Sequence, residues 1–295
     1  MFKNTLILLS LLALSLSPAS AQDDLLGMMQ EEPSKPEPVK YTFKTSRIIN
    51  GHSIEQVAGN HMDFRINHRF GYLNSGASNL YGLDAAYIRL GLEYGITDKL
   101  AIGIGRNNMV TKAFDYFAKY KLLQQTMNGS MPISTSLLAT GATEILKTTG
   151  KESLSARTTY TFQALIARKF TDGISLQLMP TMLHRNVVVN REGNSNKLKN
   201  DVFALGMGGR FKISKRSSVN LEYFYLHQPE TASLDQLRNN LSIGFDIETG
   251  GHVFQLFITN SRGMIEKDFI AAPNTSWKSG ELSYGFNISR VFSFN

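Results

Sequence analysis

Cysteine is absent from this chain of 295 residues. Its absence excludes a small secreted domain built on disulfides, a thiol nucleophile or thiolate metal site, and a lipoprotein anchored through cysteine. Long apolar runs are also missing after residue 21, since no stretch approaches the 18 consecutive apolar residues of a membrane-spanning helix. Charged residues make up 19% of the chain, below the roughly 25% of soluble globular domains.

The first 40 residues differ in composition from the rest. Residues 1–21 have a lysine near the start, a short apolar run and a small-residue ending, Ala19-Ser20-Ala21, which together predict a cleaved signal peptide. A buried N-terminal helix is the alternative interpretation of this run. Residues 22–40 combine prolines with acidic residues and predict a flexible tail. An exported chain without cysteine is compatible with a bacterial envelope protein.

Two similar hairpins stand out in the remaining sequence. The runs at 92–102 and 166–176 each consist of an alternating stretch, a Thr-Asp turn and a second alternating stretch. Alternation with a period of two marks a strand with one apolar and one polar face. Because so short a turn joins only antiparallel neighbours, both runs predict β-hairpins.

The same alternation continues from residue 60 and predicts an all-β fold, an antiparallel transmembrane β-barrel of about 12 strands over residues 59–295. We expect strands at 63–70, 86–94, 100–105, 115–122, 133–141, 157–168, 174–179, 203–211, 219–225, 241–247, 254–258 and 283–294. Residues 41–58 are ambiguous. They fit an extra strand, a hairpin around Asn50-Gly51, or a segment tucked into or under the barrel as a plug or periplasmic segment.

Connections between the expected strands alternate in length, with short turns such as 95–98 and 170–173, and longer loops such as 142–153 and 261–281. Short periplasmic turns and longer extracellular loops are typical of outer-membrane barrels. An even number of strands puts both chain ends on the short-turn side. The two Thr-Asp hairpins are therefore expected at the periplasmic rim.

The polar face of the strands decides between a membrane barrel and a soluble sandwich or lipocalin-like barrel. It carries charged residues in the middle of strands, where a membrane barrel has a wet, polar interior. The candidate lumen-lining residues are Arg65, Arg89, Glu93, Lys119, Lys121, Arg210, Glu222 and Asp246. Aromatic residues near strand ends on the apolar face fit the interfacial girdles of such barrels; they are Tyr94, Tyr120, Phe170, Phe211, Tyr223 and Phe292.

The excess of basic residues suggests anionic partners. Five acidic residues precede position 41, so the barrel region is more basic than the chain's net charge of +7 implies. Without a dense basic run, an exported chain does not fit a nucleic-acid partner. Outer-membrane lipid and lipopolysaccharide, small anionic solutes and the barrel-insertion machinery are the partners that we expect.

Residues for catalysis are sparse. None of the six histidines forms a metal-type H-x-x-x-H pair, so we expect no catalytic residues, no metal and no cofactor. An outer-membrane lipid hydrolase would need a serine and a histidine on one rim. Ser75 or Ser78 with His68 offers such a pair, and His184 also lies near a strand end on the loop side. We expect these histidines to be interfacial or loop-packing residues.

Several runs carry a resemblance to known proteins. The alternating aromatic ending at Tyr284, Phe286, Phe292 and Phe294 resembles the C-terminal signal of outer-membrane proteins. The runs 42–53, 89–98 and 165–170 resemble an uncharacterised family of bacterial outer-membrane β-barrels, a domain of unknown function, over residues 41–295. The resemblance implies a barrel and transfers no activity or site residues.

These observations predict a protein of the cell outer membrane that forms a narrow channel or a solute-binding barrel. A twelve-stranded lumen lies between small filled barrels and the open channels of 16–18-stranded porins. A structural barrel that binds a partner through its long loops, without transport, is the alternative. A lipid hydrolase is the less favoured third interpretation.

Overall fold

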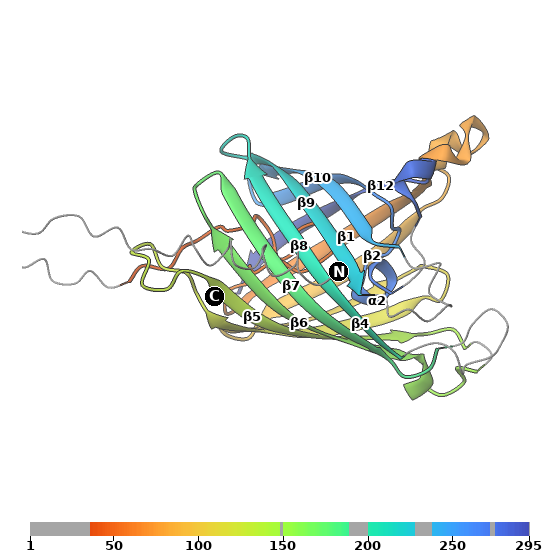
Figure 1. Cartoon of the computed structure of the whole chain (residues 1–295), viewed down its shortest axis with the longest axis horizontal. Helices are drawn as coiled ribbons and strands as arrows, with labels where there is room; N and C mark the ends of the chain where they lie inside the picture. Colours follow the sequence, from red (N-terminus) through yellow and green to blue (C-terminus); the bar gives the residue numbers. More distant parts are fainter. Residues whose placement is uncertain (1–35, 148–149, 189–199, 228–237, 272–274, 295) are drawn as a thin grey trace, which may run out of the picture. The chain divides into compact units, whose positions relative to one another are not determined.

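The computed structural model of the chain describes residues 36–147, 150–188, 200–227, 238–271 and 275–294. The expected signal peptide and residues 22–35 of the expected tail lie outside these residues. Twelve strands form one closed antiparallel barrel (Figure 1). They are β1 His61–Tyr72, β2 Tyr87–Gly95, β3 Leu100–Asn107, β4 Ala113–Leu123, β5 Ser134–Glu144, β6 Thr158–Lys169, β7 Ile174–Arg185, β8 Asp201–Lys212, β9 Ser217–His227, β10 Asn240–Thr249, β11 His252–Thr259 and β12 Ser283–Ser293.

Each strand pairs with its neighbours in sequence, and β1 pairs with β12 to close the barrel. This arrangement confirms the predicted all-β barrel and its strand number. The β1–β12 seam keeps one register from His61↔Ser293 to Arg69↔Gly285 and then shifts at a bulge before Tyr72. In β7, Pro180 lies where the β6–β7 pairing is interrupted, as expected for a residue that has no backbone N–H to donate.

Side chains alternate across the wall as the sequence predicts. The outer face is apolar, and large side chains such as Leu90, Ile104 and Leu256 are about half-exposed, at 50%, 54% and 51%. A continuous exposed apolar surface of this kind is the outward-facing band of a membrane barrel. No helix in the described part of the chain is long and apolar enough to cross a membrane.

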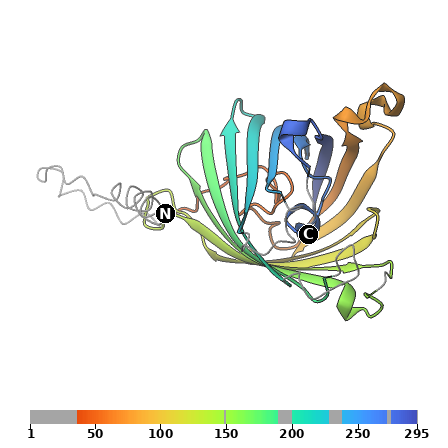
Figure 2. The same cartoon turned by 45° about the vertical axis from the view of Figure 1, so that its right-hand side comes forward.

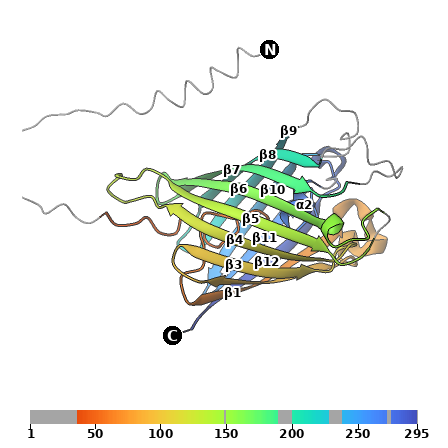
Figure 3. The same ribbon diagram turned by 90° about the horizontal axis from the view of Figure 1, so that it is seen from below.

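The short turns and the longer loops lie at opposite ends of the barrel (Figure 3). In both Thr-Asp hairpins the threonine hydroxyl fixes the turn, because Thr97 Oγ1 accepts from the N–H of Leu100 at 3.0 Å and Thr171 Oγ1 from the N–H of Ile174 at 3.1 Å. Five of the six predicted girdle aromatics follow even-numbered strands to the short-turn end. Tyr223 instead lies within β9, and its hydroxyl accepts from Asn239 at 2.7 Å.

Residues 36–59, called the lumen segment below, run from the short-turn end into the barrel (Figures 1 and 2). At the entrance, the N–H of Val39 donates to the Gln125 carbonyl at 2.7 Å, which pairs the segment with the β4–β5 turn. Inside, the segment forms a small hairpin. Ile48 N–H donates to the Gly51 carbonyl at 2.9 Å, and Ser53 N–H donates to the Ser46 carbonyl at 2.9 Å.

The loop between β11 and β12 also enters the barrel. It contains the one-turn helix α2, Glu266–Phe269. Phe269, Ile270 and Ile265 are almost completely buried. The first half of the loop at 261–281, which we considered as a partner-binding element, therefore packs inside the barrel.

Candidate functional site: the filled lumen

All eight predicted lumen-lining residues lie on the inward-facing side of their strands. Seven are at most 4% exposed, and Lys121 is half-buried near the end of β4. The sequence-based set omitted four further buried charged residues that also face inward: Asp63, Arg69, Asp115 and Glu144. Their strand parity could have identified them. With these included, the set has six basic and six acidic side chains, so its charge is balanced.

Glu222 on β9 holds the tip of the lumen segment. Its carboxylate accepts hydrogen bonds from three successive backbone N–H groups, those of Ile49 at 3.1 Å, Asn50 at 3.1 Å and Gly51 at 2.9 Å. Successive N–H groups that converge on one point form a concave anion-binding site. A wall carboxylate therefore occupies the anion site that the tip of the segment presents.

The backbone carbonyls of the segment are satisfied by side chains of the wall. Lys119 Nζ donates to the carbonyl of Ser53 at 3.2 Å and to that of Glu55. Amide side chains act in the same way: Gln177 bonds to the His52 carbonyl at 2.7 Å, Gln255 to Ile48 at 2.9 Å and Asn287 to Ile49 at 3.0 Å. These contacts supply the partners that buried peptide groups require when they are outside a sheet.

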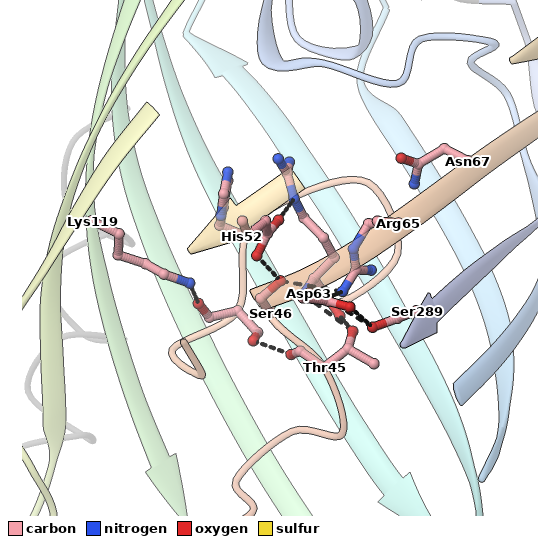
Figure 4. A network of polar contacts seen from close by, with 12 residues as sticks. Thr45, Ser46, His52, Asp63, Arg65, Asn67, Lys119 and Ser289 are labelled. Carbon is pink, nitrogen blue, oxygen red and sulfur yellow. Dashed lines mark hydrogen bonds and ion pairs between the residues drawn. The ribbon is translucent and has the colours of Figure 1, made fainter. Parts of the chain in front are cut away.

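A cluster of opposite charges surrounds the segment between β1 and β2 (Figure 4). Arg65 donates to Asp63 at 3.0 Å and to the Ser46 hydroxyl at 3.2 Å, while the Ser46 hydroxyl donates to Glu93 at 2.5 Å. Ser289 on β12 donates to Asp63 at 2.7 Å. Because these side chains are buried, each charge is held by an opposite charge or a polar partner, as buried ions require.

An apolar core completes the filling, in addition to the polar interior that the strand pattern predicts. Its members come from the segment, the wall and the β11–β12 loop; the largest are Phe43, Ile48, Ile49, Leu165, Met179, Leu183, Phe224 and Phe269. Ile48 and Ile49 pack against small inward positions, since a side chain at Gly208 would meet the Ile48 methyl at 2.2 Å. Burial of this apolar surface stabilises the closed arrangement at roughly 25 cal/mol per Å².

His52 lies at the centre of the lumen and is fully buried. Its ring packs edge-on against Phe117 at 4.5 Å and borders a cavity of about 10 Å³, which Arg47, Asp115 and Glu266 also line. A cavity of this size holds about one water molecule. Burial, together with the positive charges of Arg47, Lys119, Arg89 and Arg65, lowers the pKa of His52 well below its ordinary value of 6.5.

The low pKa of His52 predicts an acid-dependent loosening of the lumen segment. If opening exposes His52, its pKa returns to near 6.5, so only the open state takes up this proton as the pH falls. Opening is then favoured by up to about tenfold per pH unit below that value. Burial raises the pKa of Glu266, which acts in the opposite direction. The difference between wild type and His52→Gln in open fraction, measured in planar bilayers from about pH 7 to about pH 5, therefore isolates the histidine. Equal pH profiles for the two proteins would contradict this prediction.

The other two histidines that we considered for catalysis lie elsewhere. His68 is on the outer face, where its ring stacks on Phe286 at 4.9 Å, and His184 contacts Asp201 at 2.7 Å. No hydrogen bond joins His68 to Ser75 or Ser78 among the described residues. Within the same residues, no group of three His, Cys, Asp or Glu side chains is placed to hold a metal ion.

Comparison with known proteins adds a family and a fold. Residues 43–292 match the model of a family described as a membrane-bound beta barrel domain (DUF5777). Among curated proteins, none matches the sequence. The fold is similar to that of the NanC porin, with a TM-score of 0.52 and 10% identity over 78% of this chain and 98% of that one.

Two further solved structures are more distant in fold. An outer-membrane channel from Pseudomonas putida F1 has a TM-score of 0.46 and 12% identity, over 81% of this chain and 97% of that chain. The outer-membrane phospholipase A of Escherichia coli, as an active-site mutant, has a TM-score of 0.43 and 10% identity, over 89% and 94% of the two chains.

Proposed function

Because the chain belongs to this family of membrane-bound β-barrels and has a porin-like fold, we propose that it is an outer-membrane channel closed by its own N-terminal segment. The lumen segment acts as a plug. It enters from the short-turn end, which is the periplasmic end of such barrels. Withdrawal toward that end opens the barrel without breaking the pairing of its strands.

The observation that carries this proposal is the polar character of the wall behind the segment. Contacts of Glu222, Lys119 and Gln177 with the segment are hydrogen bonds to its backbone. Each of these wall groups can bond to water instead when the segment leaves, so the wall remains compatible with a hydrated pore. A barrel with a permanently filled lumen could use apolar packing throughout.

The charge of the wall indicates the class of solute. The inward-facing set has six basic and six acidic side chains, which supports small solutes of either sign. The same balance argues against a strongly selective anion pore. The outer membrane supplies lipid and lipopolysaccharide as the surrounding partners in this proposal, and insertion would depend on the barrel-insertion machinery.

Deletion of residues 36–58 tests the channel directly. The full-length protein in a planar bilayer is expected to remain mostly closed, whereas the deletion variant is expected to conduct steadily. Heat-modifiable gel migration in detergent serves as the control, because it shows whether the variant still forms a barrel. A folded deletion variant that does not conduct would contradict the proposed channel.

A structural barrel without transport is the second candidate. The lumen segment and the β11–β12 loop form an apolar core with the wall, and this packing favours the second candidate. Such a core would also stabilise a permanently closed barrel. A closed deletion variant would support this candidate. The phospholipase likeness is too distant to carry an enzymatic function, and we propose that the protein is not an enzyme.

A further inference from the structure

The lumen is closed by two elements that approach from opposite ends of the barrel. The lumen segment enters from the short-turn end and the β11–β12 loop from the other end (Figure 2). Inside the barrel they contact each other at Glu266, and apolar packing through Phe224 of β9 links them as well. Arg47 of the segment binds Glu266 of α2, with 3.1 Å between the guanidinium Nη1 and the carboxylate Oε1. Phe269 of α2 packs on Phe224 at 5.1 Å between ring centres, and Phe224 lies against the tip at Gly51.

The ion pair is the polar part of this junction and is strongly buried. The side chains of Arg47 and Glu266 are 3% and 5% exposed. Arg47 also donates to the Asn50 carbonyl at 3.1 Å within the hairpin, so its position is tied to the shape of the tip. His52 Nε2 lies 3.8 Å from the same Glu266 oxygen. The Glu266 carboxylate of the loop therefore lies close to both arms of the segment hairpin, at Arg47 and at His52.

Loss of Glu266 would leave Arg47 poorly compensated. Its remaining acidic neighbour is Glu93, whose Oε1 lies 3.8 Å from Arg47 Nε. The Glu93 carboxylate also accepts a hydrogen bond from the Ser46 hydroxyl. The positive charges of Arg65 and Arg89 act on Arg47 and lower its pKa, in addition to the larger effect of burial. A buried cation that loses one of two partners is strongly destabilised where it stands. The segment hairpin that carries Arg47 is thus stable in the lumen while Glu266 is present.

The loop holds Glu266 in a defined place. Lys267 bridges Glu144 at the end of β5, at 3.0 Å, and Asp268 at 2.8 Å. The turn before α2 is tight, because a side chain at Gly263 would come within 2.5 Å of the Phe269 nitrogen. Residues 263–271 of the loop are therefore a structured element with a defined place inside the barrel.

We propose that the β11–β12 loop is the outer gate of the channel and that Glu266 couples this gate to the lumen segment. Withdrawal of α2 removes the partner of Arg47 and loosens the segment, so both ends open together. Coupling of this kind is reciprocal, since release of the segment must loosen the loop to the same degree. A ligand that binds the outer loops and draws α2 outward would regulate opening. This inference rests on the proposed channel function for its biological meaning, although the coupling itself can be measured without conduction.

Hydrogen–deuterium exchange of the full-length protein in detergent tests the coupling. Glu266→Gln is expected to raise the exchange rate of the backbone N–H groups at 46–53 by about tenfold or more, because an uncompensated Arg47 destabilises the docked hairpin. Asp268→Asn is the matched control. It removes the same charge from the same helix, but Asp268 pairs with Lys267 and has no described contact with the segment.

The reciprocal variant completes the test. Arg47→Gln is expected to raise exchange at 263–271, in the loop, although residue 47 is far from the loop in sequence. Wild-type exchange at 46–53 in Glu266→Gln would overturn the inference, as would an equal increase in Asp268→Asn. Failure of the deletion variant to conduct would overturn the channel alone and leave the coupling standing, so the two failures are distinguishable.

Discussion

Replacement of Glu222 by leucine is expected to free the tip of the lumen segment. The carboxylate receives three backbone N–H groups from residues 49–51. All three bonds end on one oxygen, Oε2, which a glutamine carbonyl could replace, whereas leucine has no acceptor and leaves the three N–H groups without this partner. Each buried N–H left without a partner costs about 1–3 kcal/mol. A total near 3 kcal/mol corresponds to an increase of roughly a hundredfold in the opening of the segment.

Two measurements check this prediction. Exchange of the N–H groups at 46–53 should rise by about a hundredfold, and openings should appear in planar bilayers. Asp246→Leu is the matched control, since Asp246 is a buried acid on the neighbouring strand and bonds to wall side chains, Gln255 at 3.1 Å and Asn220, with no described hydrogen bond to the segment. If Glu222→Leu showed the exchange rates of wild type, the carboxylate would not be an anchor of the segment.

The strand pattern was predictable because the bilayer and the lumen impose opposite demands on alternate residues. All twelve expected strands are present, and most bounds differ by a few residues. The structure extends β7 through Pro180 to Arg185, beyond the expected end at residue 179. Pro180 has no backbone N–H to donate, and in the structure it interrupts only the pairing with β6 while the pairing with β8 continues.

The filling of the lumen was less predictable. Phe117 and Met179 alternate with outward-facing residues and so belong to the inner face, yet a polar interior gave no reason to expect them there. Alternation shows which residues share a face, whereas what lies against that face depends on distant segments. The apolar inward positions on β4, β7 and β9 find their partners in the lumen segment and in α2.

The segment itself left three interpretations open from its sequence. In the structure, its bend falls at Ile49–Asn50, one residue before the Asn50-Gly51 pair that suggested a hairpin. Gly51 instead pairs with Ile48 and lies against Phe224, where an added side-chain atom would be 3.0 Å from the ring. Contacts with the barrel wall determine this register. Such contacts between distant residues cannot be predicted from the local pattern of a single sequence.

Substitution of Gly285 by alanine is expected to prevent stable closure of the barrel. Gly285 pairs with Arg69 at the β1–β12 seam, next to the bulge in β1. An added Cβ would lie 2.1 Å from the His68 carbonyl oxygen and 2.9 Å from the Phe257 ring. The nearer atom belongs to the backbone and cannot rotate away, so the seam itself must shift. Overpacking costs about 1–3 kcal/mol even where side chains can adjust, and we expect about 3 kcal/mol or more here.

Gly250→Ala is the control for this change. Gly250 lies at the β10–β11 turn, and an added Cβ there meets nothing within 4 Å. The folded fraction, measured by heat-modifiable migration, and the urea midpoint should match wild type in this variant and fall sharply in Gly285→Ala. The pairing of β1 with β12 closes the sheet and leaves it without free edges. If this seam opens, the edges of both strands are exposed and can pair with other chains. The Gly285 variant is therefore expected to aggregate in detergent as well as to unfold, and a wild-type urea midpoint would show that β1 can move away from this position at little cost.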